Sequence, residues 1–210
     1  MGYSIKKWKE RLAERSDLSS QVIHLTKESH FDGKKLSALT NLKKIISERT
    51  IEGSDNKGFV VGTKSAVCFQ DAPLYAACQN TYFEQKYRRI NPKAKIRYSP
   101  IGIMFPKEYL YEKGGRPVLY EKTSVAKKIL PKDEWWRIVN FDMSDEDNVI
   151  DWTHEREWRC PGDFKFDISQ ATLLFVKTSN YKSFLTWDGK QKSPVLDKVK
   201  SLVVLSDILY

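Results

Sequence analysis

Two glutamates separated by a single residue lie in the segment DWTHEREWR, residues 151–159, which also holds two tryptophans and a histidine. Alternating bulky and charged residues are typical of a β-strand, whose successive side chains point to opposite faces. Glu155 and Glu157 would then share one face, with His154 and Trp158 on the other. Two carboxylates on one face are costly to desolvate, so a cationic ligand or a cationic transition state would compensate them.

The residues alone leave three interpretations of this pair open. A carboxylate beside an anomeric carbon can stabilise an oxocarbenium-like transition state. The glutamates could instead form salt bridges on a solvated strand face, with Arg116 and Arg159 as partners and no catalysis. A metal-dependent nuclease would need a further acid such as Asp142 or Asp151, and no nuclease motif is recognisable.

No familiar cofactor or metal motif accompanies the pair. Cys68, Cys78, Cys160 and His154 have the right chemistry for zinc, but their spacings match no zinc pattern, so we predict no metal site. Phosphate loops and the GxGxxG, GxSxG and HExxH motifs are also absent from the sequence. These absences exclude the commonest NTPase, dinucleotide-binding, serine hydrolase and zinc protease classes.

Composition indicates a globular protein with a basic surface. The 210 residues include 36 Lys and Arg against 27 Asp and Glu, a net charge of +9, which makes a polyanionic partner plausible. Three irregularly spaced cysteines build no disulfide framework and indicate a reducing compartment. No apolar run approaches the roughly 18 residues that span a bilayer, so we expect a cytoplasmic protein without a membrane partner.

The chain pattern predicts an α+β fold. Residues 1–18 would be an appended amphipathic helix and residues 19–210 a single catalytic domain. Helices are expected over residues 4–15, from Thr40 or Asn41 onward, over 74–89 with Asp71 as cap, and over 124–130. Strands are expected over residues 21–26, 59–69, 96–105, 116–121, 136–143, 153–160, 172–178 and 201–206. Helices first and strands later favour α+β over a doubly wound sheet.

Cations alternate with aromatic rings at the end of the helix expected over 74–89 and just beyond it. Such surfaces hold single-stranded nucleic acid by neutralising phosphates and stacking on bases. The alternative is a solvated helix face whose aromatic residues turn into the core. The candidate nucleic-acid-binding residues are Lys86, Arg88, Arg89, Lys93 and Arg97.

Short pieces between residues 20 and 160 resemble the DarT-type ADP-ribosyltransferase toxins. The pieces are VIHLT at 22–26, TNLKKII at 40–46, AVCFQDAPL at 66–74, and ERE at 155–157, which is similar to the E-x-E of many ADP-ribosyltransferases. RPVLY at 116–120 together with HEREWR at 154–159 also resembles bacterial phage-defence proteins of the abortive-infection kind. The chain departs from the DarT pattern in its longer loop before Asn41 and in having no matched arginine in the third piece.

The resemblance implies a fold of two packed, curved sheets with helices mainly in the N-terminal half. It also implies transfer of ADP-ribose from NAD to DNA or RNA by a toxin or antiphage effector, with an antitoxin protein as a further partner. Glu157 would bond the ribose hydroxyl and stabilise the oxocarbenium, and Glu155 would orient or deprotonate the acceptor. In this fold Trp158 would turn into the core. The implied NAD-binding residues are His24, Thr26, Asn41, Phe69, Arg116 and Tyr120. The alternative is a non-catalytic subunit of a defence system that binds nucleic acid or protein.

Overall fold

The computed structural model describes residues 2–56, 58–92 and 99–206, which form two compact units. The first unit comprises Met1–Arg49, Ala72–Pro106 and Phe166–Tyr210, and the second comprises Thr50–Asp71 and Lys107–Lys165. Both units combine helices with mainly antiparallel strands, in agreement with the α+β prediction. Among the described residues, no helix is both long enough and apolar enough to cross a membrane.

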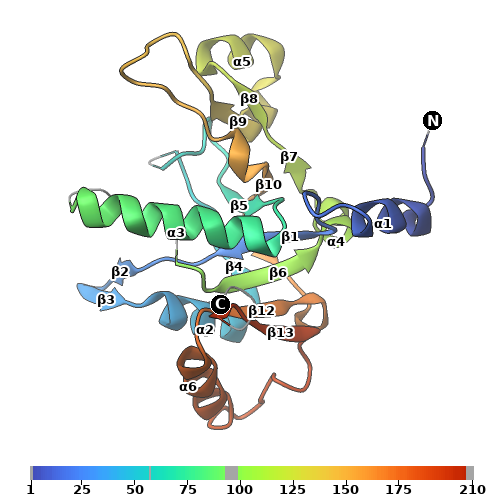
Figure 1. Ribbon diagram of the computed structural model, residues 1–210, viewed down its shortest axis with the longest axis vertical. Helices are drawn as coiled ribbons and strands as arrows, with labels where there is room; N and C mark the ends of the chain where they lie inside the picture. Colours follow the sequence, from blue (N-terminus) through green and yellow to red (C-terminus); the bar gives the residue numbers. More distant parts are fainter. Residues whose placement is uncertain (1, 57, 93–98, 207–210) are drawn as a thin grey trace. The chain divides into compact units, whose positions relative to one another are not determined.

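The first unit is built around four neighbouring strands (Figure 1). In spatial order they are β13 (Ser201–Val204), β12 (Thr172–Phe175), β6 (Gly102–Pro106) and β1 (Gln21–Leu25). Among the printed pairings of these four strands, that of β12 with β13 is parallel and the others are antiparallel. The other elements are α1 (Ile5–Ala13), the hairpin of β2 (Ser29–Phe31) and β3 (Lys34–Leu36), α2 (Ala38–Glu48), α3 (Leu74–Ile90), a short 3-10 turn (Ile168–Gln170) and α6 (Thr178–Asp188).

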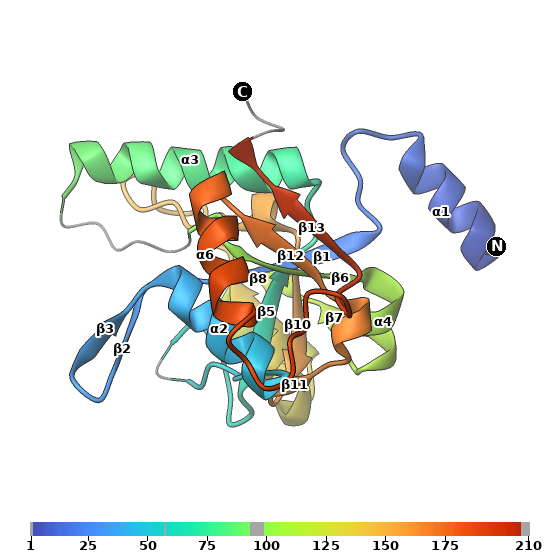
Figure 2. The ribbon, with the colours of Figure 1, turned by 90° about the horizontal axis from the view of Figure 1, so that it is seen from below.

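The helices of this unit pack on both faces of its strands, as the alternation of side chains along the strands shows. Ile23 and Leu174 pack with Ala77 of α3 on one face. Phe175, the next residue along β12, points to the other face and contacts Phe184 of α6 with ring centroids 5.3 Å apart. Figure 2 shows α3 on one side of these strands and α2 on the other. The strands are therefore covered by helices on both faces.

The second unit also carries short strands. The order is β5 (Ala66–Gln70), β10 (Glu157–Pro161) and β7 (Arg116–Pro117), all antiparallel. Two further pairs are β8 (Leu119–Glu121) with β9 (Ile138–Asn140) and β4 (Thr50–Ile51) with β11 (Phe164–Lys165). The remaining elements are α4 (Lys107–Glu112), α5 (Thr123–Ile129) and 3-10 turns at Lys132–Arg137 and Thr153–Glu155.

Both predicted helix caps were wrong. The helix expected to begin at Thr40 or Asn41 begins at Ala38, because the Ser37 hydroxyl accepts the N–H of Thr40 at 3.1 Å. Asp71 does not cap α3, which follows Pro73 without a side-chain cap. Its carboxylate instead pairs with Lys107 at 2.7 Å, within the second unit.

Several strands are shorter than predicted, and two helices were missed. The strand expected over residues 59–69 begins only at Ala66, after Gly62 at φ +92°. The strand expected over 136–143 is limited to β9, because a 3-10 turn occupies the preceding residues. No helix was expected at α4 or α6, and the latter buries only Phe184 and Asp188, too few side chains for a clear apolar periodicity.

Asp188 offers a test of the packing at the end of α6. Its buried carboxylate accepts the N–H of Val195 at 3.0 Å and that of Leu196 at 3.1 Å. Asp188→Ala leaves both groups without an acceptor, so we expect a loss of about 2–3 kcal/mol in the free energy of unfolding, and a smaller loss for Asp188→Asn. Urea denaturation measures both, with the exposed Asp197→Ala as control. Equal midpoints for Asp188→Ala and the control would contradict this assignment.

Candidate functional site

The segment that carries the two glutamates is not one continuous strand. Thr153–Glu155 form a 3-10 turn, and Arg156 is left-handed at φ +45°, so β10 begins at Glu157. The cause lies at Asp151, whose carboxylate accepts both the N–H and the hydroxyl of Thr153 at 2.8 and 2.7 Å and thereby starts a turn. The prediction of a shared strand face was therefore wrong, although both glutamates are buried, at 8% and 7% exposure.

A buried polar row crosses β10 and β5. Glu157 lies opposite Gln70 and Arg159 lies opposite Cys68 in the antiparallel register, and directly opposed side chains share a face. Glu157, Arg159 and Gln70 are all buried. The tertiary structure thus brings a carboxylate, a guanidinium, a thiol and an amide together in the second unit.

Arg159 is the most constrained member of this row. It is 2% exposed, and its Nε donates to Glu157 Oε1 at 2.7 Å while Nη2 donates to Oε2 at 3.4 Å. The other three donations reach backbone carbonyls, from Nη1 to Trp136 and Ile138 at 2.9 and 3.0 Å, and from Nη2 to Phe59 at 3.4 Å. All five N–H donors of the guanidinium are therefore used.

The residue of β10 that is buried beside Glu157 is Arg159 and not Trp158. We expected Trp158 to be turned into the core, but it is half-buried, and Arg159 is buried instead. The non-catalytic interpretation did anticipate an ion pair of Arg159 with one of the glutamates, and this pair is present. Arg116 does not join it. Its Nη1 donates to the carbonyls of Tyr111 and Gly115, and its guanidinium lies 4.0 Å from the centroid of the Tyr111 ring.

Tyr120 supports the start of β10 from the side. Its hydroxyl oxygen accepts the backbone N–H of Glu157 at 2.6 Å. Burial raises the pKa of Tyr120 to about 12, and the negative charge of Glu157 acts in the same direction. Tyr120 is thus a neutral phenol at physiological pH that holds the backbone of the candidate catalytic glutamate.

Cys68 and Gln70 complete the row, and neither was predicted. Burial is the main reason that the pKa of the Cys68 thiol is raised, and the charges of Glu157 and Glu155 raise it further. This thiol is therefore neutral and a poor nucleophile. Gln70 differs, because its buried Oε1 has no hydrogen-bond partner. An orphaned buried acceptor is uncommon in folded proteins and is a candidate contact for a ligand donor.

Two of the residues implied for NAD binding already have internal hydrogen bonds in the first unit. The buried hydroxyl of Thr26 contacts the carbonyl oxygens of Ala38 and Ile101 at 3.0 and 2.9 Å. Asn41 Nδ2 donates to the Lys27 carbonyl at 2.6 Å and also to Ser29 Oγ. These bonds fasten the loop between β1 and α2, which explains both residues without a ligand.

The remaining implied NAD-binding residues are divided between the units. His24 is half-buried in β1 of the first unit. Phe69 belongs to the core of the second unit, where it packs edge-on against Phe164 with ring centroids 5.2 Å apart. Of all the predicted site residues, the structure therefore gathers Glu157, Glu155 and Tyr120 in one place.

The candidate nucleic-acid-binding residues are only partly described. Lys86, Arg88 and Arg89 are exposed on α3, and Lys93 and Arg97 lie outside the described residues. The alternative in which the aromatic residues of this segment turn into the core was wrong. Tyr82, Phe83 and Tyr87 are exposed, and the buried residues of α3 are the smaller Ala77, Cys78 and Thr81.

The acids required by a metal-dependent nuclease are engaged elsewhere. Hydrogen bonds from Ser144 and an ion pair with Lys122 at 3.0 Å lower the pKa of Asp142 to about 2, and Asp151 is bonded to Thr153. In the described part of the chain, no three His, Cys, Asp or Glu side chains are placed to hold a metal ion.

The first unit has a surface hollow. It is a wide, open depression beside the end of α6, lined by residues that include Leu185, Pro194 and Lys198. Asp188 also borders it, but that carboxylate is already bonded to backbone N–H groups. We therefore base the candidate site on the buried row and not on the hollow.

Because Arg159 and Glu157 form a buried ion pair, we expect their contributions to the free energy of unfolding to be strongly coupled. Arg159→Leu leaves the Glu157 carboxylate buried without its cation, so we expect a loss of about 3–5 kcal/mol in the free energy of unfolding. Adding Glu157→Gln removes the stranded charge and should restore part of that loss. Arg137→Leu is the control, since Arg137 forms a more exposed ion pair with Glu134 and should cost 1 kcal/mol or less. Additive losses in a double-mutant cycle would refute the coupling.

The raised pKa of Tyr120 predicts that the stability of the folded protein decreases at alkaline pH. Its folded-state pKa of about 12 lies above the ordinary value of 10.0, so the folded protein holds this proton more tightly than the unfolded chain does. The resulting stabilisation is complete below pH 10 and is lost as pH rises from about 10 to 12. Tyr120→Phe should make stability fall less steeply over this interval, whereas the exposed Tyr111→Phe should not. Thermal melts from pH 8 to 11.5 measure the slopes, and identical slopes in all three proteins would reject the prediction.

No protein-family model, no curated protein and no solved structure matches the chain.

Proposed function

We propose that the chain is an NAD-dependent ADP-ribosyltransferase that modifies a nucleic acid and acts as a toxin or antiphage effector. One observation carries the proposal. The Glu157 carboxylate stands at the first residue of β10, buried and held in one orientation by two hydrogen bonds from Arg159. It is the second glutamate of the segment that resembles the E-x-E of ADP-ribosyltransferases, and an ADP-ribosyltransferase-type fold is part of the same proposal.

The chemistry requires a carboxylate of this kind. When the bond between nicotinamide and ribose breaks, the electron pair leaves with the nicotinamide nitrogen, and the ribosyl carbon becomes cationic. A carboxylate already oriented by its surroundings stabilises this charge without reorganising during the reaction. Arg159 weakens the field of Glu157, so the second buried carboxylate, Glu155, adds the negative charge that the cation needs.

The other buried groups receive roles in the same scheme. Glu155 accepts the proton that the acceptor base loses when it bonds to the ribosyl carbon, and the products are nicotinamide and ADP-ribosylated nucleic acid. The orphaned Gln70 Oε1 accepts a hydrogen bond from a ribose hydroxyl or from the nicotinamide amide. Tyr120 positions the Glu157 backbone and does not react.

A second candidate is a non-catalytic, nucleic-acid- or protein-binding subunit of a defence system. The completeness of the Arg159 hydrogen-bond set favours it, because an arginine with every donor satisfied already explains why a carboxylate is buried beside it. In that protein the pair would serve stability and specificity of folding alone.

Glu157→Gln separates the two candidates. The change keeps the side-chain shape but removes the charge that stabilises the ribosyl cation, so a transferase should lose about 10²-fold or more in NAD turnover. The variant should also lose stability because Arg159 remains charged. Asp188→Asn is the matched control, since it weakens the first unit without touching the glutamates.

Nicotinamide release and mass spectrometry of DNA, RNA and protein incubated with NAD provide the readouts, at a temperature where all variants are folded. In a transferase, the wild type and Asp188→Asn add one ADP-ribose unit to a nucleic acid and Glu157→Gln does not. An active, folded Glu157→Gln protein would remove Glu157 from catalysis. An inactive wild type with every nucleic acid would favour the binding subunit.

A further inference from the structure

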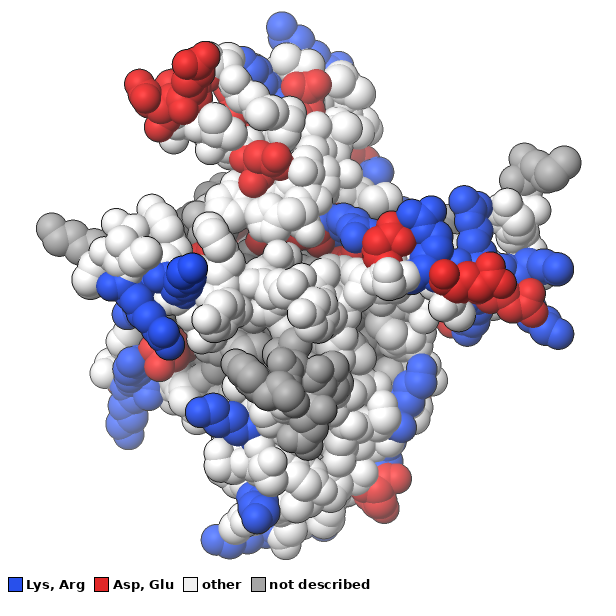
Figure 3. All heavy atoms as spheres, in the orientation of Figure 1, with Lys and Arg blue, Asp and Glu red and all other residues white. Residues whose placement is uncertain are grey.

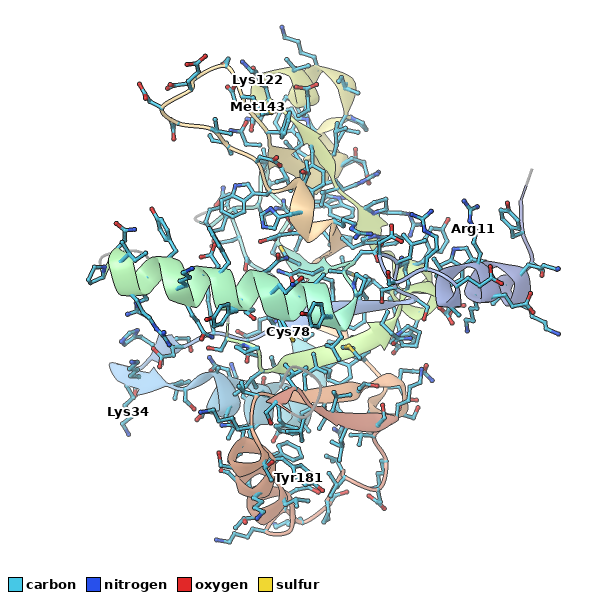
Figure 4. All side chains as sticks on the ribbon, viewed as in Figure 1. Arg11, Lys34, Cys78, Lys122, Met143 and Tyr181 are labelled. Atoms are coloured by element: carbon cyan, nitrogen blue, oxygen red, sulfur yellow. The ribbon has the colours of Figure 1, made fainter. Side chains whose placement is uncertain are left out.

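Helix α3 exposes large apolar side chains on its outer side. The side away from the buried Ala77 and Thr81 carries an apolar ridge, defined as Tyr75, Tyr82, Phe83, Tyr87 and Ile90. Phe83 is 64% exposed and Ile90 is 72% exposed. Cys78, labelled in Figure 4, belongs to the buried side of the same helix. A contiguous apolar patch of this kind on a folded domain marks an interaction surface.

The spacing of the ridge is that of a helix-packing stripe. Phe83, Tyr87 and Ile90 follow one another at i, i+4 and i+7, so they lie along one side of α3. The rings of Phe83 and Tyr87 are nearly parallel, with an interplanar angle of 17° and centroids 6.5 Å apart. Rows with these spacings interlock with the same kind of row on a facing helix. The ridge is therefore shaped to receive another helix.

The ridge carries little charge. Helix α3 is described from end to end, and the spacing places Lys86 beside the ridge. Arg88 follows Thr81 by seven residues and Ala77 by eleven, so it lies on the buried side of the helix. In Figure 3 the surface along α3 is mostly uncharged, and blue side chains gather toward its end on the left of the view. An anionic partner would meet few cations along the ridge, so we expect an uncharged, apolar partner surface.

The ridge is complementary to itself when two copies of α3 run antiparallel. Phe83 lies near the middle of Leu74–Ile90, seven residues from Ala76 and seven from Ile90. In an antiparallel pair centred on Phe83, the two Phe83 rings meet, and each large Ile90 lies across from the small Ala76 of the other copy. Large side chains opposite small ones let facing helices interdigitate. The two copies of Lys86 then lie on opposite sides of the centre, whereas a parallel pair would place these like charges side by side.

We propose that α3 packs against α3 of a second copy of this chain, antiparallel and related by a two-fold axis at Phe83. A two-fold interface uses the same self-complementary surface on both copies, and the ridge has this property. Its five residues are about half to three-quarters exposed, so they can bury roughly 500 Å² per copy. The total of about 1,000 Å² reaches the lower limit of a specific interface. The dimer is independent of the transferase chemistry.

Sedimentation velocity over a range of protein concentrations, without nucleic acid or NAD, tests the proposal. The wild type should dimerise reversibly as its concentration rises. Phe83→Glu and Phe83→Lys should each weaken the dimer about tenfold or more, because the two-fold axis brings two like charges together. An equimolar mixture of these two variants should form a heterodimer, since Glu and Lys then face each other. Phe83 is mostly exposed, so the fold should persist in both variants, and thermal melts check this.

A control variant and the salt dependence complete the test. Tyr3→Glu, which changes an exposed ring elsewhere, should dimerise as the wild type does. Salt should strengthen the wild-type dimer, because two copies with a net charge of +9 repel each other and salt screens this repulsion.

Three outcomes would overturn the proposal. The first is a wild type that stays monomeric at every concentration. The second is dimerisation of Phe83→Glu alone with wild-type affinity, which would assign the contact to another surface. The third is a mixture of Phe83→Glu and Phe83→Lys that stays monomeric, which would remove the two-fold axis at Phe83.

Discussion

The burial of Arg159 is the constraint on which the second unit depends. A guanidinium removed from water must find an acceptor for each of its five N–H groups, because every unmet donor costs free energy comparable to a lost hydrogen bond. Three of these acceptors are the carbonyls of Phe59, Trp136 and Ile138, which come from two separate stretches of chain. The loop around residue 59 and the passage from the 3-10 turn into β9 must therefore converge on β10.

The same constraint shapes the candidate chemistry. The two remaining donations hold the Glu157 carboxylate, and the Tyr120 hydroxyl holds its backbone N–H. Glu157 is therefore held both at its carboxylate and at its backbone N–H. The orphaned acceptor on Gln70 lies directly across the strand pair from this carboxylate. The hydrogen bonds that hold Glu157, together with the unpaired Gln70 Oε1 across the strand pair, distinguish this site from an ordinary buried ion pair.

Several elements could be predicted from local pattern because their side-chain periodicity is strong. The prediction for β1 differs by one residue from the strand, and that for α3 ends one residue short of the helix. The strand expected over residues 153–160 failed because the local hydrogen bonds of Asp151 to Thr153 outweigh the strand-like alternation that follows. Helix α2 begins earlier than predicted for a related reason. The Ser37 hydroxyl, about one turn before the expected cap, accepts a backbone N–H and caps the helix.

Sequence alone therefore determined the α+β class, the identity of the two glutamates worth testing, and the cations and rings of α3. Only the tertiary structure decided that Arg159 and not Trp158 is buried, and that Gln70 and Cys68 stand beside Glu157. The physical reason is that strand pairing and donor satisfaction join residues far apart in the chain. Alternation along one segment carries no information about the carbonyls and carboxylates that other segments supply.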